Sequence, residues 1–305
     1  MFKNILVPLD GSKLAEAALA PAISFAQTLG APLTLLHIIE QNAPSEVHSD
    51  RHLTRADEAE AYLQNLAQTA AENLSVQTHV HSAAVQNVAA SIIEHANREF
   101  RPDLIAMCAH GSSGFRDLLV GSIAQQVLAG GEAPLLLLQP QTAEKQPFSL
   151  RRILIPLDSD SRHDEVFDFA RSLARAYRAE LYLLTVISTF ETLSGREAAI
   201  SSLLPATASA LLDLQEENAR EHLQHHLDEI LTAGENCSAE IGRGDPVEVI
   251  AATAKRISAD LILLGTHGKS GVKAFWARSV APNVIKKTRI PLLLVPLKTS
   301  GTSEK

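Results

Sequence analysis

The chain has 305 residues, which is enough for two domains of ordinary size, and 46% of them are apolar while 20% are charged. This composition is typical of globular proteins and excludes wholesale disorder. The net charge of −8 argues against nucleic acid as the main partner. Two cysteines, Cys108 and Cys237, are too few for a disulfide framework or a four-cysteine zinc site.

The beginning of the chain is unlike a signal peptide, because Asp10 follows a short apolar run. No apolar run reaches the roughly 18 residues needed to span a bilayer. We therefore expect a soluble cytoplasmic protein that has neither a membrane nor a nucleic acid as a partner.

Three segments of the chain occur twice, in the same order. The segment 3–12 returns at 152–161, 103–114 returns at 260–271, and 133–140 returns at 290–297. This order indicates a duplicated domain. We expect one domain over 1–140, a linker over 141–150, a second domain over 151–298 and a disordered tail over 299–305.

The two copies predict the same succession of elements. Short apolar runs that are typical of buried strands occur in the first copy at 4–9, 33–39, 76–82, 103–108 and 134–138, and in the second at 153–158, 179–187, 237–244, 260–268 and 291–297. Helical patterns separate the strands, most clearly at 206–231, 245–257 and 280–287. This alternation predicts an α/β fold in which a doubly wound parallel sheet of five strands is used twice, with helices on both faces.

In such sheets a ligand binds beyond the carboxyl ends of the strands, where the strand order reverses. If the first and fourth strands are neighbours there, the crevice is lined by Asp10 and by the His-Gly loop after 103–108. A carboxylate can accept hydrogen bonds from ribose hydroxyls or a base edge. A glycine-rich loop that leads into a helix offers N–H groups to phosphate.

The ordered segments PLDGS, LLHII, DLIAMCAHGSSGFRDLLVGSIAQQVL and PLLLLQP resemble a universal stress protein domain, and the resemblance covers the chain twice. It implies a tandem member of that family, with the Rossmann-like strand order 3-2-1-4-5 that adenine-nucleotide alpha-hydrolases also have. It further implies ATP binding in members that carry the motif G-x2-G-x9-G-S/T after the fourth strand.

Each copy departs from that motif at a different end. The first copy has Gly111 and the pair Gly121 and Ser122 at the expected spacing, but Cys108 stands at the leading glycine position. The second copy has Gly265 and Gly268, but Arg278 stands where the phosphates should approach. A cysteine at a strand end is the smaller disturbance, so we expect the first copy to be the better ATP site.

The resemblance implies the following nucleotide-binding residues. In the first copy they are Pro8, Leu9, Asp10, Ile38, Met107, Cys108, Gly111, Gly121, Ser122 and Ile123. In the second, weaker copy they are Pro156, Leu157, Asp158, Val186, Leu264, Gly265, Gly268, Arg278, Ser279 and Val280. Asp10 is expected at the adenosine end and Gly121 and Ser122 at the phosphates. ATP is the expected cofactor, with Mg²⁺ as an optional companion.

Charge is distributed unevenly between the copies. Residues 1–148 carry 8 basic and 15 acidic residues, net −7, and residues 149–305 carry 19 and 20, net −1. Six basic residues and no acid lie between 269 and 289: Lys269, Lys273, Arg278, Lys286, Lys287 and Arg289. A solvated face is the ordinary interpretation, and binding of a further anion is the alternative.

The histidines show no spacing typical of a metal site. His79 and His81 alternate on a predicted strand, and His222, His225 and His226 lie at helical spacing. We interpret these groups, and the pair His48 and His52, as surface histidines and expect no metal. We interpret His110 and His267 as loop-stabilising and Cys108 as a small, half-buried residue.

No catalytic constellation stands out, so no catalytic residue is assigned. The first hypothesis is a stress-response or regulatory protein that binds adenine nucleotide. The alternatives are a tandem scaffold that has lost ATP and binds another small anion or a protein partner, and a slow ATPase. The family also implies that the two domains pair through their fifth strands as an internal pseudo-dimer, and a homodimer is left open.

Overall fold

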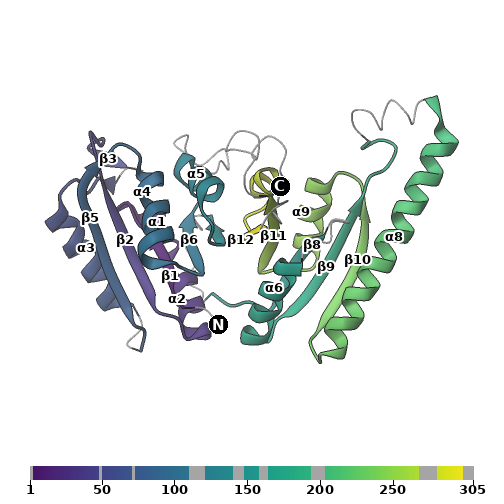
Figure 1. The fold of residues 1–305 in the computed structure, drawn as a ribbon, viewed down its shortest axis with the longest axis horizontal. Coiled ribbons are helices and arrows are strands. Elements are labelled where there is room, and N and C mark those ends of the chain that lie inside the picture. The colour runs from purple at the N-terminus through teal and green to yellow at the C-terminus, as the bar shows by residue number, and fades with distance from the viewer. Residues whose placement is uncertain are drawn as a thin grey trace, which may run out of the picture. The chain divides into compact units, whose positions relative to one another are not determined.

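The computed structural model describes residues 3–47, 50–70, 73–109, 121–139, 148–157, 164–193, 203–267 and 280–297. Contacts divide the chain into two compact units (Figure 1). Unit 1 consists of Met1–Ser149, Thr266–Ser279 and Pro291–Lys305, and unit 2 consists of Leu150–Gly265 and Val280–Ile290. Among the described residues, no helix is both long and apolar enough to span a bilayer.

The sheet of unit 1 contains all five strands predicted for the first copy. They are β1 (Ile5–Pro8), β2 (Leu33–Glu40), β5 (Val76–Val85), β6 (Leu104–Cys108) and β7 (Leu135–Leu138). They pair in parallel in the order β5-β2-β1-β6-β7, which is the predicted order 3-2-1-4-5. Most residues of β1, β2, β6 and β7 are fully buried, as expected for central parallel strands that read as continuous apolar runs.

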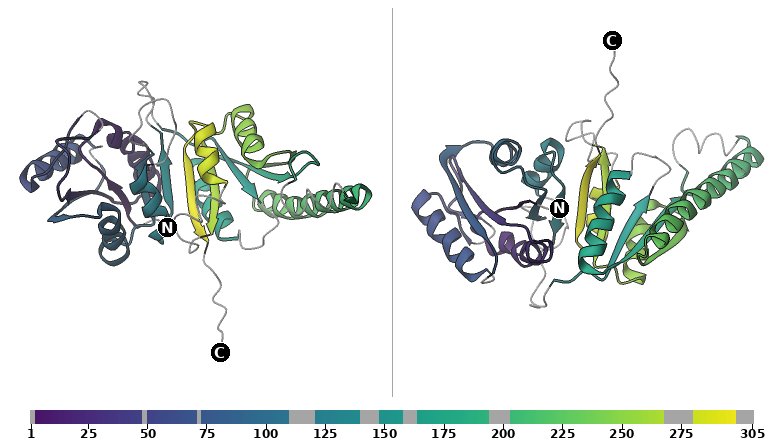
Figure 2. Two further views of the ribbon diagram at one scale, coloured as in Figure 1. Left: turned by 90° about the horizontal axis from the view of Figure 1, so that it is seen from above. Right: turned by 60° about the horizontal axis from the view of Figure 1, so that its bottom comes forward.

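Helices cover both faces of the unit 1 sheet. They are α1 (Lys13–Glu16), α2 (Leu19–Leu29), α3 (Ala56–Thr69), α4 (Val88–Glu94), the π-helix η1 (His95–Phe100) and α5 (Ser122–Gly130). Helices α2 and α3 lie on one face, and α4 and α5 pack together on the other (Figure 2). Ser12 caps α1 and Asn87 caps α4 through side-chain oxygens, and Gly30 ends α2 in the left-handed conformation.

Two features of unit 1 were not predicted. The first is a short antiparallel hairpin of β3 (Glu46–Val47) and β4 (Asp50–Arg51). The second is η1, which continues α4 with π-helical geometry. Residues 141–147 of the predicted linker and the predicted tail 299–305 lie outside the described residues. Phe148, near the end of that linker, packs on Phe25 of α2 with ring centroids 5.7 Å apart.

The sheet of unit 2 repeats the design. Its strands are β8 (Arg152–Leu157), β9 (Glu180–Ile187), β10 (Cys237–Arg243) and β11 (Leu261–His267), in the order β10-β9-β8-β11. This is the predicted order 3-2-1-4, and the pairings of β8 with β9 and β11 and of β9 with β10 are parallel. The predicted fifth strand, β12 (Leu292–Leu297), belongs by its contacts to unit 1, where it pairs antiparallel with β7.

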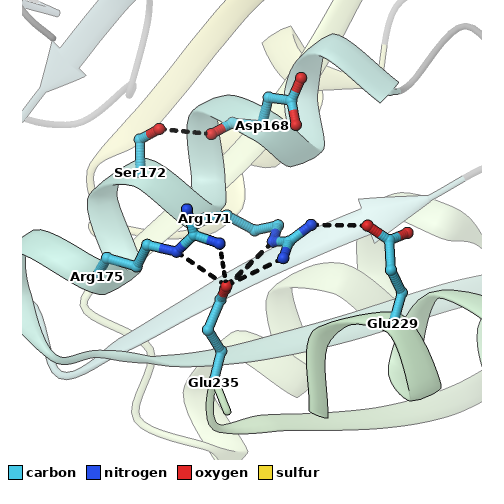
Figure 3. Close-up of polar contacts among 6 residues, drawn as sticks. All are labelled: Asp168, Arg171, Ser172, Arg175, Glu229 and Glu235. Carbon is cyan, nitrogen blue, oxygen red and sulfur yellow. Dashed lines mark hydrogen bonds and ion pairs between the residues drawn. The ribbon is translucent and has the colours of Figure 1, made fainter. Parts of the chain in front are cut away.

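The helices of unit 2 are α6 (Asp164–Tyr177), α8 (Pro205–Thr232), α9 (Pro246–Arg256) and α11 (Ala281–Lys287). Asp245 caps α9 by accepting from two backbone N–H groups. Charged side chains connect α6 to the end of α8 (Figure 3). The Glu235 carboxylate accepts from Arg171 at 3.1 Å and from Arg175 at 2.6 Å, and Arg171 also pairs with Glu229 at 2.7 Å.

Candidate nucleotide site at the tips of β1 and β6

The tip of β1 turns sharply into helix α1. The Asp10 carboxylate accepts from the Ser12 backbone N–H at 2.9 Å and from the Ser12 hydroxyl at 2.7 Å. The Ser12 hydroxyl oxygen in turn accepts from the Ala15 N–H at 3.1 Å. Asp10 therefore holds the cap of α1 in place, because the cap needs a correctly oriented hydroxyl.

Gly11 is required between these two residues. Its φ is +91°, in a region that favours glycine, and a Cβ there would lie 2.8 Å from Cγ of Leu53. Leu53 follows the β3–β4 hairpin, so this segment closes over the tip of β1. Position 159, where the second copy carries Ser instead of Gly11, lies outside the described residues.

His37 fastens this segment to the sheet. Its Nδ1 lies 2.8 Å from the Leu9 carbonyl oxygen, and its Nε2 lies 3.1 Å from the Leu53 carbonyl oxygen. Burial lowers the pKa of His37 below its ordinary value, while the two carbonyl contacts oppose that shift. A neutral imidazole donates from only one nitrogen, so it satisfies one carbonyl at a time. Sequence reasoning missed His37, although a histidine inside an apolar strand was a visible signal.

The tip of β6 lies beside the tip of β1, as the predicted crevice requires. Ile5 and Leu6 pair in register with Leu104 and Ile105. Cys108 is buried, and burial, with a smaller contribution from the Asp10 charge, raises its pKa to about 12. A thiol that is buried and protonated is unreactive. Cys108 is therefore more deeply buried than the half-buried residue that the sequence predicted.

Carboxylates gather around the β1 tip. The Lys13 backbone N–H donates to Asp50 at 2.8 Å, and the Tyr62 hydroxyl donates to Glu16 at 3.3 Å. Burial raises the pKa of Tyr62, and the charges of Glu16, Asp10 and Asp50 raise it further. This negative environment suits the hydroxyls and amino group of a nucleoside better than its phosphates.

Helix α5 begins where the motif predicts contact with phosphate. Gly121 is its N-cap residue, and its carbonyl oxygen accepts from the Gln125 N–H at 3.0 Å. Among the described residues no side chain caps this helix, so none of them occupies its first N–H groups with a capping oxygen. Ser122 is exposed and Ile123 is 36% exposed. Gly111 and His110 lie outside the described residues.

Of the remaining first-copy residues, Ile38 lies in β2, and Met107 lies in β6 next to Cys108. Both side chains are buried, as is that of Leu9. Pro8 ends β1 and is half-buried. The structure thus brings Asp10 and Cys108 together at the reversal of strand order. Contact of these residues with a nucleotide stays a prediction.

In the second copy the structure describes fewer of the predicted residues. Pro156 and Leu157 end β8, Val186 lies in β9, and Leu264 and Gly265 lie in β11. Val280 is the N-cap residue of α11 and has no side-chain cap. The other four, Asp158, Gly268, Arg278 and Ser279, lie outside the described residues. Of the basic stretch, Lys287 is paired with Glu248 at 2.6 Å.

The family model named Usp, the universal stress protein family, matches residues 1–139 and 149–296. The universal stress protein E homolog of Haemophilus influenzae is 25% identical over 96% of both chains. A universal stress protein of Methanocaldococcus jannaschii is 29% identical over 149 residues, which are 48% of this chain and 81% of that protein. The solved structure of a universal stress protein from Archaeoglobus fulgidus matches 98% of this chain and 97% of its own, with a TM-score of 0.69 and 19% identity, which supports the fold.

The match of the family model to both copies extends over most of the sequence. The chain therefore belongs to the universal stress protein family, as a tandem member with two copies of the family domain.

Proposed function

We propose that the first copy binds adenine nucleotide at the tips of β1 and β6, as part of a regulatory role in a stress response. The observation that carries this proposal is the meeting of Asp10 and Cys108 where the strand order reverses. The nucleoside would lie near Asp10, within the carboxylate-rich region. The phosphates would lie at the start of α5, with Mg²⁺ as an optional companion.

The start of α5 supports the phosphate assignment. Its N-cap residue is a glycine without a side-chain cap, and Ser122 adds an exposed hydroxyl next to it. N–H groups at a helix N-terminus carry a partial positive charge, which attracts phosphate oxygens. The second copy has Arg278 at the equivalent place, where a bulky side chain replaces close backbone approach.

Calorimetric titration of the full chain with ATP tests the proposal. Gly121→Asp places a negative charge against the phosphates, and we expect ATP affinity to fall at least tenfold. Arg278→Asp is the matched variant in the second copy and should leave the affinity unchanged. Unchanged affinity in Gly121→Asp contradicts the site, and loss in Arg278→Asp moves it to the second copy.

Mass spectrometry of small molecules released from the purified protein separates this function from its alternative. Released adenine nucleotide supports the proposal, and a different anion supports the scaffold that has lost ATP. A slow ATPase would show Mg²⁺-dependent turnover that Gly121→Asp removes.

We also infer that the two copies form an internal pseudo-dimer in the cytoplasm. The antiparallel ladder of Leu292, Leu293 and Leu294 with Leu137, Leu136 and Leu135 supports the pairing. Sedimentation at low concentration should give the mass of one chain, whereas a ladder between chains should give twice that mass. Cell fractionation tests the location.

A further inference from the structure

Three histidines and one glutamate gather at the edge strand of the unit 1 sheet, on the far side of β2 from β1. His79 and His81 alternate along β5, so they point to the same face. His95 and Glu99 come from η1, which packs over that face. The four side chains range from half-buried to exposed, and Glu99 is 48% exposed.

The geometry of three of these residues suits a metal ion. One ligand atom from each of His79, His95 and Glu99 lies within 4.8 Å of the other two. His95 Nδ1 is 2.7 Å from one Glu99 oxygen, and His79 Nδ1 is 3.8 Å from the other. Ligand atoms around a tetrahedral zinc ion are roughly 3.3 Å apart, because each bond is about 2.0 Å long. The exposed Glu99 side chain can make the small rotation that this spacing requires.

His81 holds His95 in the orientation that a ligand needs. His95 Nε2 lies 3.0 Å from His81 Nδ1, so one of the two nitrogens donates to the other. If His95 Nε2 carries the proton, His95 Nδ1 presents a lone pair toward the Glu99 carboxylate. Two electron-rich atoms at 2.7 Å repel each other unless a cation lies with them, and that cation is a proton or a metal ion.

At the corresponding place in unit 2, a carboxylate is paired with a positive charge. His79 pairs in register with Leu36, and Glu240 pairs with Leu184, the residue equivalent to Leu36 in the repeat. Glu240 is bound by Arg256 through both carboxylate oxygens at 2.6 Å. In unit 2 an arginine therefore supplies the positive charge beside the carboxylate. In unit 1 the partners of Glu99 are imidazoles.

The first copy has one residue more than the second between the helix cap and the aspartate that precedes the fourth strand, and this residue changes which side chains meet there. The cap residue Asn87 precedes Asp103 by 16 positions, whereas the cap residue Asp245 precedes Asp260 by 15. A π-helix takes up one more residue per turn than an α-helix, and unit 1 has η1 in this interval. Counted back from the aspartates, Glu99 takes the place of Arg256. The π-helical turn thus carries both the carboxylate and the neighbouring His95.

We propose that His79, His95 and Glu99 bind one divalent transition-metal ion and that His81 is a positioning residue for His95. Two imidazoles and one carboxylate favour zinc or a similar first-row ion over magnesium or calcium, which prefer oxygen ligands. The exposure of Glu99 leaves room for a water molecule as the fourth ligand. This proposal replaces the expectation of no metal, which rested on sequence spacing alone.

The protonation of His79 agrees with this role. Burial lowers its pKa, and the neighbouring His95 and His81 act in the same direction, while the Glu99 charge opposes the shift. A neutral ring is the form that binds a metal ion.

Titration of the chelator-treated full chain with Zn²⁺, and with Co²⁺ as a spectroscopic probe, tests the proposal. We expect one Zn²⁺ per chain and a visible Co²⁺ absorption band. His79→Gln and Glu99→Gln should each weaken Zn²⁺ binding at least tenfold and remove the Co²⁺ band. Mg²⁺ in excess should not compete. Absence of stoichiometric Zn²⁺ binding by the wild-type chain overturns the site.

The second copy offers a variant that should fold and bind no metal. His79→Glu combined with Glu99→Arg reproduces the pair of Glu240 and Arg256. It should keep the melting temperature of the wild-type chain without metal and lose Zn²⁺ binding. His222→Gln is the matched control, because the Nε2 atoms of His222 and His226 on α8 are 3.1 Å apart. Zn²⁺ retained in the double variant, or lost in His222→Gln, overturns the proposal.

The positioning role of His81 has its own test. His81→Gln keeps a side-chain oxygen that can accept the proton of His95, and His81→Leu does not. We expect His81→Gln to retain most of the Zn²⁺ affinity and His81→Leu to lose it. Equal affinities in the two variants contradict the positioning role.

Discussion

The two units share a strand order and a succession of helices. They differ in the side chains that lie between the third strand and the helix that follows it. Unit 2 fills it with an ion pair of Glu240 and Arg256, to which the Tyr182 hydroxyl also donates. Unit 1 fills it with histidines, Glu99 and a π-helical turn. A duplicated fold can therefore keep its core while the chemistry of one edge changes.

The two units also differ in the sizes of the side chains at this place. His81 and Gly242 occupy equivalent positions, since they pair with Ile38 and Val186. The fourth residue after the helix cap is Ser91 in unit 1 and Val249 in unit 2. In unit 1 the large His81 on the strand accompanies the small Ser91 on the helix. In unit 2 the small Gly242 on the strand accompanies the larger Val249 on the helix.

The largest effect is expected for Gly242→Ala. The new Cβ would lie 2.4 Å from Cγ1 of Val249, a stiff β-branched side chain. Overpacking of this kind should lower the free energy of unfolding by about 1–3 kcal/mol. Urea denaturation followed by circular dichroism measures it. Adding Val249→Ser, which copies unit 1, should recover part of the loss, and no recovery would show that the clash is not the cause.

A smaller loss is expected for Glu235→Gln, which removes the charge between Arg171 and Arg175. The equivalent helix of unit 1, α2, contains no charged residue and so cannot form such a network. We expect a loss of about 1–2 kcal/mol in the free energy of unfolding.

The pH dependence identifies the cause of that loss. Burial alone would raise the pKa of Glu235, but the two arginines bring it below its ordinary value of 4.5. The stabilisation is thus present above pH 4.5 and is lost as the pH falls below it. Urea denaturation at pH 7 and pH 3 should show the difference between wild type and variant shrinking. A difference that persists at pH 3 contradicts the ionic origin.

Arg256→Gln should cost less. The Arg256 side chain is 55% exposed and that of Glu240 is 30% exposed, so water screens their attraction. We expect a loss of about 0.5–1 kcal/mol, which should decrease in 1 M salt. Thermal denaturation at low and high salt measures it, and a loss above about 2 kcal/mol would contradict the assignment of a weak, solvent-screened ion pair.

The smallest effect is a pH dependence between pH 7 and pH 5 that His37 of unit 1 should cause. His37 is equivalent to Thr185 of unit 2, and burial holds its pKa below 6.5. Because the unfolded chain then binds the proton more readily, stability falls as the pH drops below 6.5. The free energy of unfolding should decrease between pH 7 and pH 5 more in wild type than in His37→Thr. Equal slopes in urea denaturation contradict this prediction.

The repeats and apolar runs predicted the strands well, because buried parallel strands are continuous apolar segments bounded by turns. Their order was implied by the resemblance to the universal stress protein family. The sequence also placed Asp10 and the segment of Cys108 at neighbouring strand tips. The β3–β4 hairpin was missed because three of its four strand residues are charged and its strands are too short to show periodicity. The π-helical turn was missed because one extra residue inside a helix leaves the apolar pattern almost unchanged.

The histidines show that spacing along the chain is a poor guide to exposure and to metal binding. Their spacing along the chain indicated surface residues, but His52 is 7% exposed. His79 and His95 are 16 residues apart and come together only through the crossover from β5 to η1. Spacing reveals a metal site when the ligands share one element, and here they belong to two.

Both cysteines have a practical consequence for following this protein in solution. Burial, with a contribution from nearby carboxylates, raises the pKa of Cys108 and of Cys237 to about 12, so almost no thiolate exists in the native state at neutral pH. Cys108 is also buried, so its alkylation requires local opening and the rate of alkylation reports the free energy of that opening, whereas Cys237 is only half-buried. The chain thus carries an intrinsic sensor of opening at the β1–β6 tip.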